Sequence, residues 1–407
     1  MVSSRQSSQS SFLRDAWVEV DLAAIEHNVA VVNSWIKRPV NACRLMAVVK
    51  SDAYGHGAPS VAEVLSASGA DCFGVASVDE GSQLRASGIE KKIVILSPAP
   101  FWALENAIAN KLDLTITSLK QAQALDIAAR KADKQASVHI KVDSGMHRLG
   151  IDPRALNEIL DFIDSAKALE LQSVFSHLAK AGDRQASLAQ FDVFSPLMET
   201  IRNSSKYKAL PFHLASSEAT RSIPDIHLDM VRVGLYLYGL EPRSTANDLK
   251  PAMSVRGRIN HIGSLPEGES AGYNGTWTAT RPSRLASIPI GYADGVDRRL
   301  SNQMAGTIFG KSIKQVGLIS MDQMMFDITD LPEAEEGDVI TLIGPGEKKH
   351  AGKSPDSSSS LKLCDWASSL DTITYELACR LRARLPRIYT RPRPSSPSDL
   401  KSMNSIL

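Results

Sequence analysis

The pattern of apolar and polar residues changes once along the chain, near residue 251. Between residues 45 and 240, short β-branched apolar runs recur: LMAVV, FGVAS, KIVILS, LTIT, SVHIKV, LQSVFSH, PFHLASS and VRVGLYLYG. Most of the intervals between these runs place apolar residues three and four positions apart, as in QAQALDIAARKA and ALNEILDFIDSA. Because such spacing is typical of amphipathic helices, this part of the chain predicts strands and helices in alternation.

The number of these β/α units decides between two folds. About eight consecutive units predict a TIM-like α/β barrel of parallel strands with its helices outside. An open doubly wound sheet is the main alternative, but the count of eight and the length of the segment favour the barrel.

The remainder of the chain has a different character. Helical periodicity fades after residue 251, and short or alternating apolar runs such as MSVRGRINHIG, RLASIPIGYA and GDVITLIGPG follow, separated by turn residues. This pattern predicts a smaller C-terminal β-rich domain. We therefore expect a barrel over residues 15–250 and a β domain over 251–390. The strand-like segment 17–21 (WVEVD) precedes the barrel and is expected to join the β domain.

Three polar stretches are expected to be irregular. Residues 1–14 are rich in Ser and Gln, residues 345–361 form a Ser- and Lys-rich loop, and residues 391–407 begin RPRPSSPSD. Such compositions cannot bury enough apolar surface to offset the entropy of ordering. We expect two disordered tails and one surface loop.

Composition limits the classes of function. The 407 residues carry a formal net charge of +1, which gives no sign of a nucleic-acid or membrane-surface partner and favours small-molecule chemistry. The four cysteines form no C-x-x-C pair, so we expect buried residues of a reduced, cytoplasmic protein: Cys43, Cys72, Cys364 and Cys379. The sequence predicts no metal site and no membrane span.

The string AVVKSDAYGHG places Lys50 directly after the first predicted barrel strand. Barrel enzymes carry their catalytic groups at the C-terminal ends of the strands. A lysine there can be desolvated, which lowers its pKa and leaves the neutral amine that attacks an aldehyde. A surface lysine after a buried strand would show the same local pattern. The residues around Lys50 are therefore needed to distinguish a catalytic lysine from an ordinary surface lysine.

The whole string resembles the cofactor-lysine motif of the alanine racemases, pyridoxal-phosphate enzymes in which a barrel is followed by a β domain. The resemblance extends over roughly residues 17–390 and includes KVDSGMHRLG, MVRVGLYLYG, AGYNGTWTATRP, IPIGYADG and LISMDQMMFDIT. These motifs follow the family in order and spacing. The resemblance implies a homodimeric enzyme that uses pyridoxal 5'-phosphate to interconvert L- and D-alanine.

The resemblance also assigns the residues that hold the cofactor. It implies that Lys50 binds pyridoxal phosphate covalently and acts as one base once the substrate has displaced it. Tyr54, Ser217 and the backbone around Gly234 would bind the phosphate, for which hydroxyl and N–H donors are suited. His177 would pack near the pyridine ring.

Three further cations have implied roles. Arg232 matches the arginine that faces the pyridine nitrogen; since an arginine does not release its proton, it leaves this nitrogen unprotonated and disfavours transamination. Arg148 matches the residue that bonds the cofactor phenolate and approaches the substrate carboxylate. Lys141 matches a position where family members can carry a carbamylated lysine, with an ordinary lysine paired to an acid as the alternative.

The second base would come from the β domain. Racemisation removes a proton from one face of the substrate and returns it on the other, so two opposed bases are needed. By resemblance the second base is Tyr273, supplied by the other subunit of a dimer. Met321 and Asp322 would line the substrate pocket from the same side, and Tyr292 would line the access channel.

Alternatives remain at this point. A racemase for serine or for a broader set of small amino acids is the nearest, although Lys141 favours the narrow enzyme. An amino-acid decarboxylase of the same architecture, a non-catalytic cofactor carrier and a barrel aldolase are further alternatives. The chain departs from the family at Ala383, where a tyrosine is frequent, and at Ser216, where an asparagine is frequent.

Overall fold

The computed structural model describes residues 14–36, 43–240, 248–346, 360–381 and 383–391. Nearly all of the two predicted tails and most of the predicted 345–361 loop lie outside these residues. The chain divides into two compact units, each described by itself: a barrel unit (Ile25–Gly239 with Ala246–Lys250) and a β unit (Met1–Ala24, Leu240–Thr245 and Pro251–Leu407).

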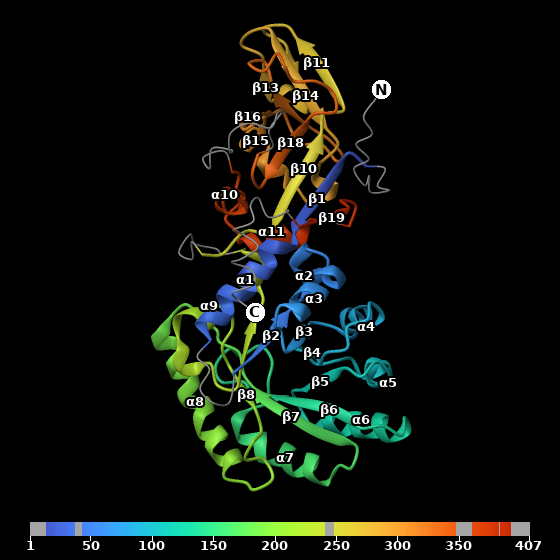
Figure 1. Ribbon diagram of the computed structural model, residues 1–407, viewed down its shortest axis with the longest axis vertical. Coiled ribbons are helices and arrows are strands. Elements are labelled where there is room, and N and C mark those ends of the chain that lie inside the picture. The colour runs from blue at the N-terminus through green and yellow to red at the C-terminus, as the bar shows by residue number, and fades with distance from the viewer. Residues whose placement is uncertain (1–13, 37–42, 241–247, 347–359, 382, 392–407) are drawn as a thin grey trace, which may run out of the picture. The chain divides into compact units, whose positions relative to one another are not determined.

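The barrel unit contains a sheet of eight parallel strands in the order β8-β7-β6-β5-β4-β3-β2-β9, which confirms the predicted barrel (Figure 1). The strands are β2 (Arg44–Val48), β3 (Cys72–Val75), β4 (Ile93–Ile95), β5 (Asp113–Ile116), β6 (Ala136–Lys141), β7 (Leu169–Phe175), β8 (Phe212–His213) and β9 (Met230–Val233). The two end strands are linked by hydrogen bonds from Asp229 N to Phe212 O and from Arg232 N to Ala215 O, both 3.0 Å. The barrel is therefore nearly closed.

Helices follow the strands and cover the outside of the barrel, as expected when parallel strands are buried on both faces (Figure 1). They are α3 (Ala58–Ala67), α4 (Val78–Ala86), α5 (Leu104–Ala109), α6 (Leu119–Lys131), α7 (Leu156–Ser165), α8 (Arg184–Arg202) and α9 (Ser217–Ser222), with α1 (Leu22–Trp35) before the first barrel strand. Serine caps begin two of them: Ser77 Oγ accepts from Glu80 N, and Ser118 Oγ accepts from Gln121 N, both at 3.3 Å.

The β unit is built on a nine-stranded sheet in the order β11-β14-β17-β16-β15-β18-β10-β1-β19. Its strands are β1 (Ala16–Asp21), β10 (Met253–Arg258), β11 (His261–Leu265), β14 (Ser283–Ile288), β15 (Ala305–Ile308), β16 (Lys311–Val316), β17 (Met324–Asp327), β18 (Val339–Ile343) and β19 (Arg387–Thr390). Strand β1 pairs antiparallel with β10 and parallel with β19. A separate hairpin joins β12 (Ser270–Ala271) to β13 (Trp277–Thr278), and two short helices, α10 (Leu363–Ser369) and α11 (Thr374–Arg380), precede β19.

The cysteines lie in different environments. Cys43 and Cys72 are buried, and burial raises the pKa of the Cys72 thiol to about 12. Cys364 is half-buried and Cys379 is exposed, so the expectation of four buried cysteines is wrong for this pair. Cys379 is exposed because helix α11 turns Thr374, Leu377 and Ala378 toward the interior and the next residue, Cys379, toward solvent.

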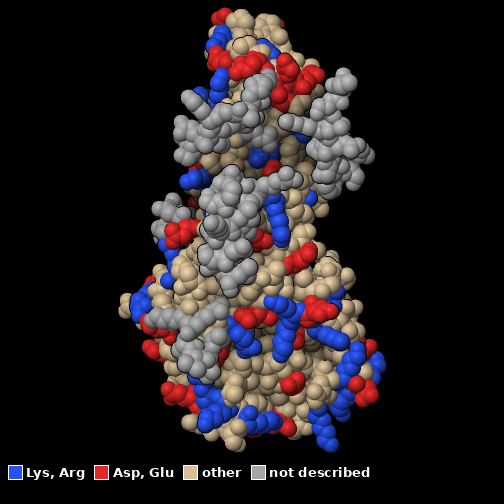
Figure 2. Space-filling model, in the orientation of Figure 1, with Lys and Arg blue, Asp and Glu red and all other residues tan. Residues whose placement is uncertain are grey.

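The surface carries both signs of charge, interspersed over the face that Figure 2 shows. None of the helices within the described ranges combines the length and the apolar composition needed to cross a lipid bilayer.

Candidate active site

Lys50 lies at the end of strand β2, where the chain enters an unusual turn, α2 (Lys50–Gly55). The four residues after Lys50 all have a φ of 54°, and Gly55 has a φ of 81°. A left-handed conformation costs a non-glycine residue roughly 1–2 kcal/mol. The turn therefore needs support from its surroundings to hold Lys50 at the rim of the barrel.

Two carboxylates provide this support. Glu80 on α4 accepts hydrogen bonds from Ser51 N and Ala76 N, both at 2.8 Å, and so ties the turn to the neighbouring β3–α4 loop. The carboxylate of Asp52 accepts from Ala58 N at 2.7 Å and joins the end of the turn to helix α3. Glu80 was not singled out from the sequence, where it reads as an ordinary residue in the first turn of a helix.

Three of the residues expected to bind phosphate lie together. Gly234 N donates to Ser217 Oγ at 3.1 Å, and the ring of Tyr54 lies directly over Gly234. A Cβ at position 234 would stand 2.6 Å from Tyr54 Oη, so the close approach requires glycine. The rings of Tyr54 and Tyr238 lie 5.1 Å apart, and Tyr238 Oη donates to Val48 O at 2.9 Å, which anchors this aromatic pair on β2.

Arg232 lies buried at the C-terminal half of β9, with its guanidinium held on several sides. Its Nη1 donates to His213 Nδ1 at 2.9 Å, and its Nη2 donates to Ser176 O at 2.7 Å and to Leu214 O at 3.1 Å. Nη2 also lies 3.2 Å from His177 Nδ1. Burial lowers the pKa of Arg232 to about 9, so the side chain stays a cation at neutral pH.

Positive charge is concentrated around this arginine. Burial, and after it the charges of Arg232, Arg148 and Lys50, lower the pKa of Lys141 to about 8, with Asp143 opposing. Burial and the same cations lower the pKa of His177 to about 3, so its ring is neutral and can accept from Arg232. The barrel unit thus brings Lys50, Arg148 and Arg232 within electrostatic range of both Lys141 and His177, and this concentration of positive charge suits an anionic ligand.

The loop that carries Arg148 owes its shape to two residues. Asp143 Oδ1 accepts from the backbone N of Gly145, Met146 and His147, each at 3.0 Å, in a turn typical of aspartate. Gly150 has a φ of 140°, and a Cβ there would stand 2.4 Å from Asp143 N. The loop is therefore closed at both ends, with the exposed Arg148 between them.

Tyr273 belongs to the β unit, in the turn between β12 and β13 (Ser270–Ala271 and Trp277–Thr278). Gly272, with a φ of 75°, and Asn274, with a φ of 60°, make this turn tight. Tyr273 is 67% exposed and lines an open hollow of about 330 Å³. The other residues of this hollow are Gly272, Ser287, Leu318, Ser320, Gln323, Met324 and Met325.

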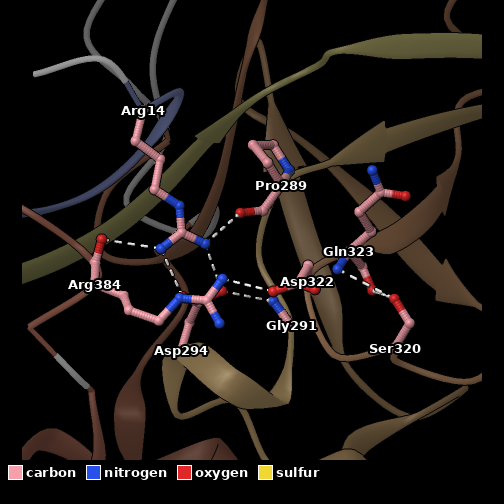
Figure 3. A network of polar contacts seen from close by, with 8 residues as sticks. All are labelled: Arg14, Pro289, Gly291, Asp294, Ser320, Asp322, Gln323 and Arg384. Carbon is pink, nitrogen blue, oxygen red and sulfur yellow. Dashed lines mark hydrogen bonds and ion pairs between the residues drawn. The ribbon is translucent and has the colours of Figure 1, made fainter.

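Asp322, another sequence-predicted residue of the β unit, belongs to a polar network (Figure 3). Asp294 is fully buried and accepts two hydrogen bonds from Arg14, both 2.7 Å, and one from Gly291 N at 3.0 Å. Arg384 lies 3.4 Å from Asp294 and donates to Asp322 Oδ1 at 2.5 Å. The carboxylate of Asp322 is therefore engaged by an arginine of its own unit.

The same network joins two loops of the β unit. Tyr292 N donates to Ser320 O, and Ala293 N donates to Met321 O, both at 3.0 Å. Tyr292 and Met321 are thus held in neighbouring loops. Tyr292 lines a second hollow, of about 620 Å³, which contains Arg298 and Arg380 and does not include Tyr273 among its lining residues.

The motifs assign no role to two buried histidines, His213 and His139, of which His213 contacts Arg232. His213 accepts from Arg232, and its ring stacks on Phe175 at 4.7 Å with 6° between the planes; His139 lies one strand beyond Ser173. A signal was available in the sequence, since a histidine within an apolar strand run (SVHIKV, PFHLASS) must find a partner when buried.

Both parts of the chain match known protein families. Residues 20–242 match the alanine racemase N-terminal domain, and residues 252–389 match the alanine racemase C-terminal domain. An alanine racemase from Nostoc sp. is 39% identical over 385 residues, which cover 93% of this chain and 96% of the relative. One from Synechocystis sp. is 39% identical over 380 residues, 92% of this chain and 98% of that relative.

Solved structures agree with these matches. An alanine racemase from Clostridium difficile 630 superposes with a TM-score of 0.85 at 29% identity, covering 94% of this chain and 97% of its own. The alanine racemase from Bacillus anthracis with bound L-Ala-P superposes with a TM-score of 0.83 at 32% identity, covering 94% and 96%.

Proposed function

The chain belongs to the alanine racemase family, and we propose that it interconverts L- and D-alanine with pyridoxal 5'-phosphate, using Lys50 and Tyr273 as opposed bases. Family membership makes the protein an isomerase that acts on an amino acid. One observation supports the proposal beyond family membership. The rim of the barrel carries the amine of Lys50, a cluster of cations around Lys141, and the close approach of Tyr54 to Gly234, which we call the glycine cradle.

The residues present fit this cofactor. Excess positive charge from Arg148, Lys141 and Arg232 suits an anion, and the Ser217 hydroxyl and the Gly234 amide are donors of the kind that hold a phosphate. Tyr54, packed over Gly234, would complete the phosphate site. When bound, pyridoxal phosphate supplies an electron sink that acidifies the α-C–H of an attached amino acid.

Lys50 has two roles in this proposal. Its Nζ would hold the cofactor covalently, and after the substrate amine takes its place the freed amine would remove or return the α-proton on one face. The left-handed turn supported by Glu80 would fix the backbone from which this amine reaches.

Tyr273 would serve the opposite face, and we assign it to the partner subunit of a homodimer by its family resemblance. The exposure of large side chains in the β unit supports such an association: Tyr273 is 67%, Met321 53% and Tyr292 40% exposed. Apolar surface of this kind is stabilised when a partner covers it. The active site would then be complete only in the dimer.

Arg232 would face the pyridine nitrogen, with His177 packed near the ring. Because a guanidinium only donates hydrogen bonds, it would leave that nitrogen unprotonated. Electron withdrawal into the ring is then weaker than with a carboxylate partner, which disfavours transamination and keeps the reaction to proton transfer.

Arg148 would bond the cofactor phenolate and approach the substrate carboxylate. Lys141, whose lowered pKa makes its neutral amine accessible near neutral pH, is the residue we propose to be carbamylated. Its amine would take up CO₂ and release a proton, giving an anion that orients Arg148. ¹³C NMR of protein equilibrated with labelled bicarbonate tests this; absence of a Lys141-dependent carbamate signal would leave an ordinary lysine.

Met321 and Asp322 would bound the substrate pocket from the β unit, with the charge of Asp322 offset by Arg384. A methionine side chain there would restrict the pocket to a small substituent. Tyr292, held in the loop next to Met321, would line the access channel.

The test is chiral chromatography of L-alanine incubated with the pyridoxal-phosphate-loaded protein, with L-serine run in parallel. Formation of D-alanine without loss of total alanine supports the proposal, and the ratio of the two rates ranks the substrates. Retained chirality of both amino acids in a cofactor-loaded protein would refute it. Release of CO₂ and an amine would indicate a decarboxylase.

A further inference from the structure

A chain of polar side chains runs through five successive barrel strands, from β9 to β5. We call it the polar relay; its members are Arg232, His213, Ser173, His139 and Asp113. None of them is more than 6% exposed. The successive contacts measure 2.9, 2.8, 2.5 and 3.2 Å. Buried polar groups that cross most of a barrel interior need a reason, because an apolar layer would pack there at lower cost.

The direction of the hydrogen bonds follows from the two ends. Arg232 can only donate, so Nδ1 of His213 accepts and its proton sits on Nε2. Nε2 of His213 then donates to Ser173 Oγ. The single hydroxyl hydrogen of Ser173 is left for His139 Nδ1, and Nε2 of His139 donates to the Asp113 carboxylate, which as an anion only accepts.

Burial supports the same assignment at His213. Desolvation, followed by the charge of Arg232, lowers the pKa of His213 well below its ordinary value, so the ring is neutral. Phe175 also fixes the geometry, since it stacks on the His213 ring and lies 5.3 Å from the Arg232 guanidinium carbon. The imidazole is therefore held in both rotation and tautomer.

We propose that the polar relay positions Arg232: it transmits the negative charge of Asp113 across three neutral groups and makes His213 Nδ1 a strong, correctly oriented acceptor. Hydrogen bonds in such a chain polarise one another and strengthen at low dielectric. The relay members beyond Arg232 are positioning residues that act through it. The consequence for the reaction rests on the proposed function, in which Arg232 sets the protonation of the cofactor ring.

The first test needs neither cofactor nor activity. ¹⁵N-edited NMR of imidazole groups in the apoprotein at neutral pH reads the tautomer of each ring. The relay requires His213 and His139 both as neutral Nε2–H tautomers. An imidazolium at His139, or an Nδ1–H tautomer at either ring, overturns the proposal.

The second test breaks the relay in the middle and at its end. Ser173→Ala removes both bonds of the hydroxyl, and Asp113→Asn removes the terminal charge. Thr115→Val is the matched control, because Thr115 is a buried hydroxyl on β5 that donates to Ile95 O outside the relay. The readouts are the ¹⁵N shifts of the Arg232 guanidinium in the apoprotein and the ratio of transamination to racemisation in the loaded enzyme.

We expect Asp113→Asn and Ser173→Ala each to shift the Arg232 signals and to raise the ratio of transamination to racemisation about 10-fold, the size of effect that loss of an outer hydrogen-bond partner often has on activity. The double variant should match Ser173→Ala alone, because the end of a broken relay no longer reaches Arg232. Additive effects, or a Thr115→Val variant that shifts the same signals equally, overturn the proposal. If wild-type protein fails to racemise alanine while the apoprotein tautomers are as stated, the proposed function fails and the positioning of Arg232 stands.

Discussion

Adding a single methyl group at Gly234 should weaken cofactor binding while the barrel unit stays folded. An alanine Cβ at residue 234 would stand 2.6 Å from Tyr54 Oη and 3.1 Å from two of its ring carbons. To restore an ordinary contact of 3.4 Å, the hydroxyl must move by about 0.8 Å, the difference between 3.4 and 2.6 Å. Tyr54 is packed against Tyr238, whose ring centroid lies 5.1 Å away, which limits how far the Tyr54 ring can move aside.

The magnitude follows from overpacking and from a lost contact. Overpacking a tight site costs about 1–3 kcal/mol of folding free energy. Displacing one hydrogen bond to a charged phosphate costs about 1.5–3 kcal/mol of binding, which corresponds to about 10- to 100-fold weaker affinity. We expect Gly234→Ala to lose affinity for pyridoxal phosphate by this factor while the unit remains folded.

The assay is titration of the apoprotein with pyridoxal phosphate, followed by absorbance, together with urea unfolding. Gly182→Ala is the control, since a Cβ there meets only a Glu218 side-chain carbon at 3.5 Å. Equal affinities of wild type, control and Gly234→Ala would refute both the cradle and the assignment of the phosphate to it.

Three further outcomes are expected. Arg232→Glu should protonate the pyridine nitrogen and raise the yield of pyruvate relative to D-alanine, measured by chromatography; an unchanged ratio contradicts the assigned role. The pKa of His177 is lowered from its ordinary value to about 3 in the folded protein. Below about pH 6.5 the unfolded chain is therefore protonated at this residue while the folded chain is not, so the free energy of unfolding falls as the pH drops. Urea unfolding at about pH 7 and about pH 5 should show that wild type loses more unfolding free energy than His177→Gln. The difference should stay below about 2 kcal/mol, because the partly exposed ring is also screened by solvent. The same pH dependence in both proteins would contradict a lowered pKa of His177. Asp294→Asn should cost about 2–4 kcal/mol in urea unfolding, since it weakens the bidentate pair between the fully buried Asp294 carboxylate and the partly exposed Arg14. Loss of the exposed Asp330–Arg281 pair by Asp330→Asn should leave the unfolding transition nearly unchanged.

The barrel could be predicted from the sequence because its strands are buried on both faces. All eight apolar runs correspond to strands β2 to β9, since parallel strands covered by helices leave near-continuous apolar stretches. The elements of the β unit were harder to predict from the sequence. Strand β19 and helices α10 and α11 lie in a polar stretch where short elements are stabilised by tertiary contacts, such as the β1–β19 pairing, that no local pattern encodes.

Part of the candidate site could also be predicted from the sequence, and part could not. The sequence motifs indicated Tyr54, Ser217 and Gly234, and the structure places these three residues together. The support of Lys50 by Glu80 was not predictable, because a helix N-terminal glutamate has the same sequence pattern whether it caps its own helix or reaches a neighbouring turn. The relay histidines were visible only as polar residues inside apolar runs, and their partners come from three other strands.

The rate at which Tyr273→Phe, loaded with pyridoxal phosphate, interconverts the two alanine enantiomers, compared with the rate of wild type, tests whether Tyr273 is the second base. Loss of one of two bases should lower the racemisation rate about 100- to 10,000-fold in both directions while the absorbance of the bound cofactor is retained. A Tyr273→Phe protein that racemises alanine at the wild-type rate would contradict the two-base account.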